Sequence, residues 1–480
     1  MTTRRSLVFA ALDRYSSLVI NVISVMILAR LLAPAEVGIF SVTMALLTMA
    51  ATVRDMGAGN YLLQEKELTT DRIRAVWAVQ LGLGITLAVI VALASGPVAD
   101  FYAAPAMRSI MLLLALNYLI NPVGSLTYAW LMREMRYDAI AVMRFSSTVA
   151  GAVVSVYLAW RGHGAISLAW GSLTTTIVNS AVSMIYRSPN FPWRPSLKEV
   201  DRVLNFGVKL TGTSIFNSLS AAAPEFFLAK LQNMASAGFY SRANGLVALF
   251  NRLVTDAVYT VALSMFSRQA RSGLDYGEPF LRALCYMTAL SWSFCLSLVF
   301  LAHPTILVLY GDQWGDSVAL TRWLALAAVF VTPVPLCTAA LVGAGQMREV
   351  MGATLVSAAA TTIAAAVGAV WGLAVLGPAL VVAGAIGAAA WLYCVHRQIR
   401  FDWADLRRHA LSSLAVAAFT AAGPALAVAY FGWIPTALWP ALLLGSGVGV
   451  VGFLVSVLWL KHPLSAEIQS LWSRIRPPRN

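Results

Sequence analysis

The chain has 480 residues, of which 59% are hydrophobic and only 11% are charged. Too little polar surface is available to cover a water-soluble globule of this length, so the composition excludes that class and indicates an integral membrane protein. A formal net charge of +13 is also typical of nucleic-acid-binding proteins, but the basic residues are dispersed between apolar runs. We therefore expect membrane lipid as a partner and no nucleic acid.

The first part of the chain predicts six transmembrane helices, because apolar runs of about 20 residues alternate with short polar gaps. They lie near residues 9–31, 36–56, 76–98, 107–130, 138–160 and 165–186. A Pro-rich segment follows, and in it Ser196 and Glu199 have the spacing of a capping box that opens a short helix.

The remainder of the chain predicts eight more transmembrane helices. They lie near residues 203–231, 236–267, 280–302, 317–343, 350–372, 376–396, 410–431 and 437–460. The expected fold class is therefore an all-α integral membrane protein of about 14 transmembrane helices, with short connections on both sides of the bilayer.

An internal repeat divides this chain into two similar halves. After an offset of 200 residues, the run Leu28-Ala29-Arg30-Leu31 with Ala35, Gly38, Phe40 and Ser41 returns as Leu228-Ala229-Lys230-Leu231 with Ala235, Gly238, Tyr240 and Ser241. Since each repeat holds an even number of helices, we expect two six-helix lobes in the same orientation, related by a pseudo-two-fold axis along the membrane normal. Such lobes enclose a central cavity in many transporters.

The repeat and the helix pattern together predict the domain organisation. We expect an N-terminal lobe over residues 1–187, a cytoplasmic amphipathic linker over 188–202, a C-terminal lobe over 203–400, and two further helices with a basic cytoplasmic tail over 401–480. With the N-terminus inside, most of the 34 Lys and Arg residues fall on the cytoplasmic side, as the positive-inside rule requires. Both termini are therefore expected in the cytoplasm.

Motifs for enzymatic chemistry are missing from the sequence. No G-x-x-x-x-G-K-[ST] phosphate loop occurs, and neither the five histidines nor the four cysteines have metal-ligand spacing. We therefore expect no catalytic residue, no metal and no cofactor, and the chain is predicted not to be an enzyme.

Ionisable residues inside the predicted helices are the strongest functional signal. Placing one such group at the centre of a bilayer costs about 2.5–3.5 kcal/mol, so these side chains are expected to face the protein interior. There they would line a basic, partly water-filled vestibule, in which guanidinium forks and an ammonium group bind an anionic headgroup. The predicted substrate-binding residues are Arg14, Arg54, Arg144, Lys209 and Arg252.

Simpler roles compete with binding at these positions. Four of the charged residues lie near enough to the membrane interface for their charged groups to reach water: Asp13, Arg14, Arg144 and Lys209. Arg54 with Asp55 could close a helix end. Asp256 lies four residues after Arg252 and could neutralise it.

Four acidic residues and three outward-facing cations complete the candidate set. Glu225 follows Pro224, whose kink frees backbone carbonyls, and it could couple an ion or pair with Lys230. The predicted positions for ion coupling or charge balance are Asp13, Asp55, Glu225 and Asp256. The predicted residues of the outward end are Arg30, Lys230 and Arg242.

Several motifs in fixed order resemble those of one transporter family. These are Ile27-Leu28-Ala29-Arg30-Leu31-Leu32-Ala33-Pro34-Ala35-Glu36-Val37-Gly38-Ile39-Phe40, Arg54-Asp55-Met56-Gly57, Arg133-Glu134-Met135-Arg136-Tyr137, Gly238-Phe239-Tyr240-Ser241-Arg242-Ala243 and Leu309-Tyr310-Gly311-Asp312-Gln313-Trp314. Over about residues 10–350 the chain resembles the Wzx-type polysaccharide-export flippases of the multidrug/oligosaccharidyl-lipid/polysaccharide exporter superfamily. Family members commonly have Asp where this chain has Glu225.

The resemblance implies export of undecaprenyl-diphosphate-linked oligosaccharide units across a bacterial inner membrane by alternating access, for exopolysaccharide, capsule or O-antigen synthesis. A polysaccharide polymerase and co-polymerase are the implied partners. Coupling to Na⁺, H⁺ or the membrane potential is open, since each uncompensated negative charge moved outward gains about 2.3 kcal/mol per 100 mV. Two alternatives remain: a cation-coupled drug antiporter of the same superfamily, which would favour an acidic cavity, and a membrane glycosyl polymerase or ligase, which would need a larger outward loop.

Overall fold

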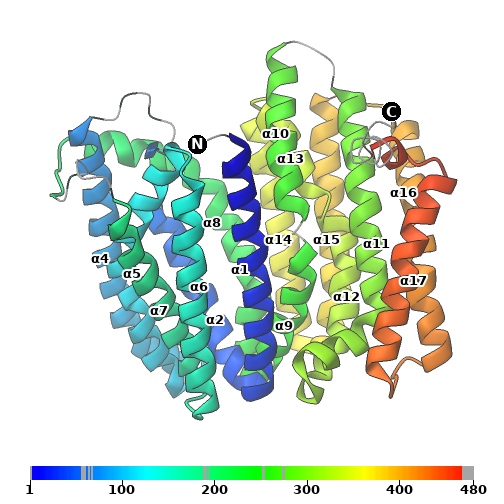
Figure 1. The fold of residues 1–480 in the computed structure, drawn as a ribbon, viewed down its shortest axis with the longest axis horizontal. Helices are drawn as coiled ribbons and strands as arrows, with labels where there is room; N and C mark the ends of the chain where they lie inside the picture. The colour runs from blue at the N-terminus through cyan, green and yellow to red at the C-terminus, as the bar shows by residue number, and fades with distance from the viewer. Residues whose placement is uncertain are drawn as a thin grey trace, which may run out of the picture. The chain divides into compact units, whose positions relative to one another are not determined.

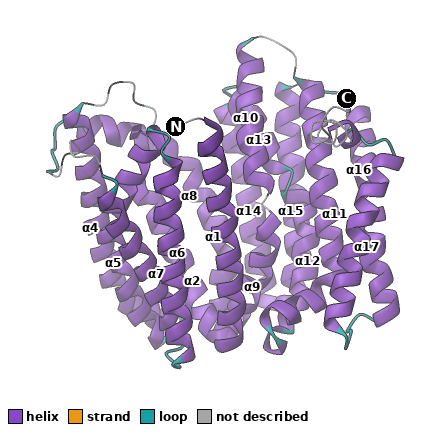
Figure 2. Cartoon of the chain, viewed as in Figure 1, coloured by secondary structure: helices purple, strands orange, loops and turns teal. Residues whose placement is uncertain are grey.

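The structure is a computed structural model of the chain. It describes residues 3–55, 61–62, 65, 67, 69–187, 192, 194–250, 254–272, 276–399 and 401–467, with the backbone alone at residues 3–14, 53, 55, 205–213 and 256–257. All regular secondary structure in these ranges is helical (Figure 2). Ten of the described helical segments are long and apolar enough to cross a membrane, so the predicted all-α integral membrane class is confirmed.

The chain packs as two compact units, residues 1–238 and 239–480. The helices of the first unit, coloured blue to green in Figure 1, are α1 (Thr3–Leu31), α2 (Pro34–Asp55), α4 (Thr70–Phe101), α5 (Pro105–Arg133), α6 (Tyr137–Trp160), α7 (Ile166–Ile185) and α8 (Val200–Leu231). Within it α1 packs on α6, α5 on both α4 and α7, and α8 on α2 and α4. Because α8 packs here, the units divide the chain later than the repeat does, and the predicted lobe boundaries stay a prediction.

Helix α9 (Met234–Phe250) begins in the first unit and continues into the second. The other helices of the second unit are α10 (Asp256–Arg271), α11 (Gly277–Tyr310), the 3₁₀ turn η2 (Asp312–Trp314), α12 (Asp316–Val331), α13 (Val334–Gly343), α14 (Met347–Trp371), α15 (Leu373–Gln398), α16 (Trp403–Phe431) and α17 (Leu438–Trp459). Helix α11 packs on α12, α16 and α17, and α15 packs on α12 and α14.

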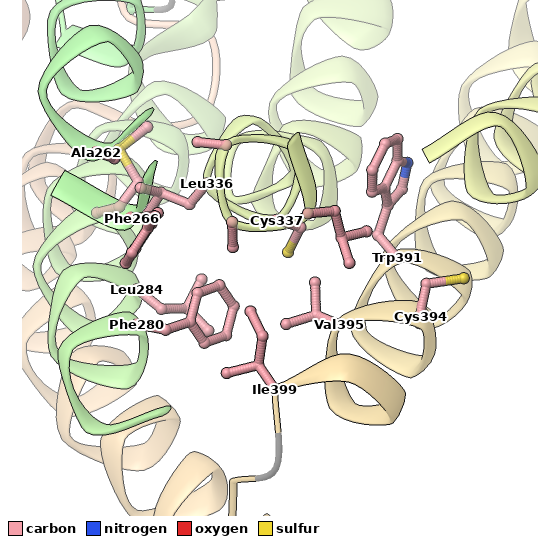
Figure 3. Packing of buried hydrophobic residues seen from close by; sticks show 14 of the residues in the cluster. Ala262, Phe266, Phe280, Leu284, Leu336, Cys337, Trp391, Cys394, Val395 and Ile399 are labelled. Carbon is pink, nitrogen blue, oxygen red and sulfur yellow. The ribbon is translucent and has the colours of Figure 1, made fainter. Parts of the chain in front are cut away.

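A buried apolar cluster holds α10, α11, α13 and α15 together in the second unit. Figure 3 shows Phe266, Phe280, Leu336 and Val395 pointing toward one another, and each is at most 1% exposed. Since lipid is as apolar as these side chains, the cluster contributes close packing rather than escape from water.

Two details of the predicted helices differ from the structure. Residues expected as one helix over 317–343 form α12 and α13, which together make one candidate membrane span. The break falls at Pro333, which has no amide hydrogen to donate within a helix. The predicted helix over 236–267 contains α9 and α10, and residues 251–253 between them lie outside the described residues. The predicted capping box is wrong: Glu199 has a left-handed backbone (φ 62°) directly before α8, and its carboxylate binds Arg72.

Candidate functional site

Arg54, the penultimate residue of α2, is the best-placed candidate cation in the first unit. The residue is 9% exposed, and its guanidinium carbon lies 5.6 Å from the centre of the Tyr118 ring on α5. The Tyr118 hydroxyl donates a hydrogen bond to the Leu47 carbonyl (2.5 Å), which fixes that ring against α2. Arg54 is therefore held inside the unit by a cation–π contact and is shielded from lipid.

The remaining predicted anion ligands are described unevenly. Arg144 is exposed on α6. Arg14 and Lys209 lie in α1 and α8, but their side chains fall outside the described residues, and Arg252 falls outside the described chain altogether. A binding role for Arg54 and these four cations stays a prediction.

Of the predicted acidic positions, the structure describes the side chain of Glu225 alone. It is half-buried in α8, next to the buried Pro224. The side chains of Asp13, Asp55 and Asp256 lie outside the described residues, so the alternative pairing of Asp256 with Arg252 stays a prediction as well.

Two of the three predicted outward-end cations lie at helix ends in the first unit. Arg30 is exposed at the end of α1. The Lys230 ammonium, at the end of α8, donates a hydrogen bond to the Phe101 carbonyl (2.5 Å) and lies 4.0 Å from the centre of the Phe101 ring. Lys230 thus joins the end of α8 to the end of α4, and its pairing with Glu225 stays a prediction.

Arg242, the third of these cations, lies in an aromatic setting in the second unit. Its guanidinium carbon is 5.8 Å from the Tyr310 ring centre and 5.5 Å from that of Trp314, which is fully buried. The Phe239 and Trp314 rings meet edge to face, and Ser317 donates a hydrogen bond to the Phe239 carbonyl (3.1 Å). Two motifs, residues 238–243 and 309–314, are therefore neighbours in space, which their sequence positions did not predict.

A charge network at the start of α4 was missed by the sequence analysis. The Glu65 carboxylate binds Arg72 (3.4 Å) and Arg202 (3.3 Å), and Arg72 also binds Glu199 (3.0 Å). Arg133, at the end of α5, donates hydrogen bonds to the carbonyls of Leu62 and Glu65, both at 2.7 Å. The motif Arg133–Tyr137 was the sequence feature that could have indicated this network, because Arg133 binds the segment that follows α2.

A buried hydrogen-bonded cluster joins α11, α16 and the residues after α17. The Cys285 thiol lies 3.1 Å from Nε2 of His462, and Ser413 donates to the Cys285 carbonyl (3.1 Å). The Leu464 amide donates to Nδ1 of His462 (3.2 Å), so Nε2 carries the proton of the neutral ring. Burial lowers the pKa of His462 to about 4, and the positive charge of His409 adds to this effect.

Nothing in the described residues gathers the ligands of a metal: they contain no group of three His, Cys, Asp or Glu side chains that could hold an ion. Two units of long apolar helices, with cations buried against aromatic rings, define the class of a multi-pass membrane transporter.

Comparison with known sequences specifies the family. Residues 27–319 match the family described as "Polysaccharide biosynthesis protein", and the chain belongs to it. It is similar to the succinoglycan biosynthesis transport protein ExoT of Rhizobium meliloti (strain 1021), with 25% identity over 100% of this chain and 97% of that protein. It is also similar to the lipopolysaccharide biosynthesis protein WzxC of Escherichia coli (strain K12), with 23% identity over 65% of this chain and 63% of that protein.

A solved structure supports the same fold assignment. The lipid II flippase MurJ in an inward closed conformation superposes with a TM-score of 0.78, covering 94% of this chain and 99% of MurJ. At 13% sequence identity this likeness concerns the fold alone. The chain therefore has the fold of MurJ over nearly its whole length.

Proposed function

We propose that this protein is a flippase that moves undecaprenyl-diphosphate-linked oligosaccharide units from the inner to the outer leaflet of a bacterial inner membrane. Membership of the polysaccharide biosynthesis family carries the proposal, with ExoT and WzxC as named relatives over much or all of the chain. The fold of MurJ supports it, because MurJ is itself named as a lipid II flippase.

The diphosphate is the part of the substrate that the predicted cations recognise. A guanidinium presents N–H donors in a planar fork that matches phosphate oxygens, and in low dielectric such charge-assisted bonds are strong. Arg54, buried beside Tyr118, supplies one such group. Arg14, Arg144, Lys209 and Arg252 supply the others in our proposal, while the lipid tail stays between helices.

The orientation is proposed from charge. With both termini in the cytoplasm, the Glu65 network and the His462 cluster face the cytoplasm, and the α1–α2 and α8–α9 turns face outward. An interior-negative potential then favours outward movement of the anionic headgroup, by about 2.3 kcal/mol per uncompensated charge at 100 mV. If the cations move with the substrate this bias shrinks, and Glu225, Asp13, Asp55 or Asp256 becomes a candidate for Na⁺ or H⁺ coupling.

A reconstituted flipping assay tests the function directly. Purified protein in vesicles receives a defined undecaprenyl-diphosphate-linked oligosaccharide, and its appearance in the opposite leaflet is followed with and without an imposed potential. We expect protein-dependent flipping that Arg54→Gln or Arg252→Gln reduces at least tenfold. Arg282→Gln is the matched control, because Arg282 is exposed and forms a surface pair with Glu278 (3.2 Å) that contributes little.

Three results would contradict the proposal. The first is no protein-dependent flipping by correctly inserted protein. The second is a drug-resistance defect in a deletion strain whose polymer production is normal, which indicates the cation antiporter. The third is glycosidic bond formation by the pure protein, which indicates a polymerase or ligase.

A further inference from the structure

Two glycines at equivalent positions of the internal repeat contact each other in the first unit. A Cβ built on Gly38 would overlap the Met234 carbonyl and would lie 3.0 Å from the Gly238 nitrogen. A Cβ built on Gly238 would overlap the Pro34 carbonyl and would lie 3.2 Å from the Gly38 nitrogen. The first turns of α2 and α9 therefore cross backbone to backbone, with no room for a side chain.

The contact is reciprocal in the register of the repeat. Gly38 contacts Met234, and Gly238 contacts Pro34. Since an offset of 200 residues relates 38 to 238 and 34 to 234, these two contacts are the same contact seen from the two repeats. Reciprocity of this kind is the property of an interface on a two-fold axis, where the same surface occurs on both partners. We call the segments Pro34–Gly38 and Met234–Gly238 the glycine crossing.

Each side of the glycine crossing satisfies its own backbone amides. The Ala33 amide donates to the Glu36 carboxylate (2.8 Å), and the Ser236 amide donates to Oδ1 of Asn233 (2.9 Å). Separating the two turns therefore leaves these amides bonded, and what is lost is van der Waals contact between backbones. A contact of that kind is specific in shape but costs little to break, as a reversible closure requires.

A second contact holds the same turn in place. Lys230 lies four residues before Met234, and its ammonium bonds the Phe101 carbonyl at the end of α4. The α8–α9 turn is thus attached to α2 through the glycines and to α4 through Lys230, both within the first unit.

We infer that the glycine crossing is the reversible closure of the outward end in this conformation, with Lys230 as a supporting latch. The inference rests on the proposed alternating-access function and on the proposed orientation. Opening the outward end parts the α1–α2 turn from the α8–α9 turn. A methyl group at either glycine prevents the crossing from closing and shifts the protein toward outward-open states.

Pulsed electron paramagnetic resonance measures this shift without requiring transport. Spin labels on Leu31→Cys and Leu231→Cys report the distance between the α1–α2 turn and the α8–α9 turn, because these leucines are 40% and 51% exposed at the ends of α1 and α8. The native cysteines, Cys285, Cys295, Cys337 and Cys394, are buried, which limits background labelling.

The expected result has three parts. Gly38→Ala and Gly238→Ala should each lengthen the label distance to a similar extent, and the double variant should add little, since one methyl already opens the crossing. Lys230→Met, which changes an exposed side chain, should produce a smaller shift in the same direction. Gly82→Ala on α4 is the matched control, because a Cβ there meets nothing within 4 Å.

The outcomes separate this inference from the proposed function. Unchanged distances in correctly inserted Gly38→Ala and Lys230→Met proteins would overturn it, as would wild-type protein that never shows the longer distance when lipid-linked oligosaccharide and a potential are supplied. If the variants show longer distances but the wild-type protein flips no lipid-linked oligosaccharide, the glycine closure is supported and the proposed flippase function is contradicted. If the closure and the flippase function are both correct, flipping by the glycine variants should fall at least tenfold.

Discussion

The α1–α2 turn and the α8–α9 turn have related sequences and equivalent backbone hydrogen bonds, from Leu32 to Leu28 and from Gln232 to Leu228, but different side chains satisfy their helix-start amides. In the first, the Glu36 carboxylate reaches back to the Ala33 amide (2.8 Å). In the second, Oδ1 of Asn233 accepts hydrogen bonds from the Ser236 amide (2.9 Å) and hydroxyl (3.2 Å). Any suitably placed oxygen can satisfy the free amides at the start of a helix, so this role passes easily from one residue to another.

The glycines of the same turns show the opposite behaviour. Gly38 and Gly238 are identical in the two repeats, because their neighbours across the crossing are backbone atoms that cannot move aside. The residues that satisfy the helix-start amides differ, since Glu36 of the first repeat corresponds to Ser236 of the second and Asn233 corresponds to Ala33. Repeats thus retain identity where backbones touch and diverge where side chains can replace one another.

The aromatic support of Arg242 makes the largest expected difference between the units. Trp314 is fully buried, so Trp314→Ala should lower the free energy of unfolding by about 3–5 kcal/mol through the cavity it leaves. Thermal or denaturant unfolding in detergent measures the change. Trp439→Ala, at a residue 60% exposed, is the control and should change little. Equal losses in the two variants would contradict this account of Trp314.

The second unit should also respond to acid through His462. Its pKa lies near 4 in the folded protein and near 6.5 when unfolded, so the unfolded state binds the proton first as pH falls. The stability due to neutral His462 is complete above about pH 6.5 and is lost progressively toward pH 4. Unfolding midpoints across this range should fall in the wild type and fall less in His462→Gln. Parallel pH curves for the two proteins would show that His462 does not titrate in this way.

The two caps should prove equivalent despite their different chemistry. Asn233→Ala and Glu36→Ala should each destabilise the protein by about 1 kcal/mol, because each leaves one helix-start amide without its partner. Asn244→Ala, at an exposed position within α9, tests the loss of an amide side chain away from the cap. A clearly larger loss in one of the two cap variants would mean that the turns are not interchangeable.

The smallest expected effect concerns the tyrosine that supports Arg54. Tyr118→Phe keeps the ring and removes the hydrogen bond to the Leu47 carbonyl, which also accepts a bond within its helix. We expect a loss of about 0.5 kcal/mol in unfolding free energy and flipping close to that of wild type. Tyr393→Phe, at a residue 63% exposed, should match the wild type. A collapse of flipping would assign the hydroxyl itself a role in binding.

The membrane class, most helix positions and the repeat could be predicted from the sequence, because hydropathy and spacing are local properties. The break between α12 and α13 was missed because residues 317–343 were treated as one apolar run, although Pro333 and Pro335 are a local signal that the helix ends there. Glu199 was misassigned because its partner, Arg72, lies 127 residues away.

In the candidate site, too, local features could be predicted from the sequence and contacts between distant segments could not. Charge inside an apolar run identified Arg54 as an interior residue, since burial follows from the cost of exposing a charge to lipid. That Arg242 meets Tyr310 and Trp314, or that Gly38 meets Gly238, depends on tertiary packing between distant segments. The repeat identified Gly38 and Gly238 as equivalent residues, but only the structure shows that they contact each other.

Deleting α16 and α17 would be more damaging than their position at the end of the chain suggests. Helix α11 presents Thr288 and Cys285 to them, and Ser413 and His462 satisfy these polar groups. A protein shortened to its first 400 residues would lose the partners of the Cys285 thiol, while the Thr288 hydroxyl would keep its hydrogen bonds to the Leu284 and Cys285 carbonyls within α11. The last two helices are therefore the cover of a polar seam on α11, and the thiol is the group that their removal would uncover.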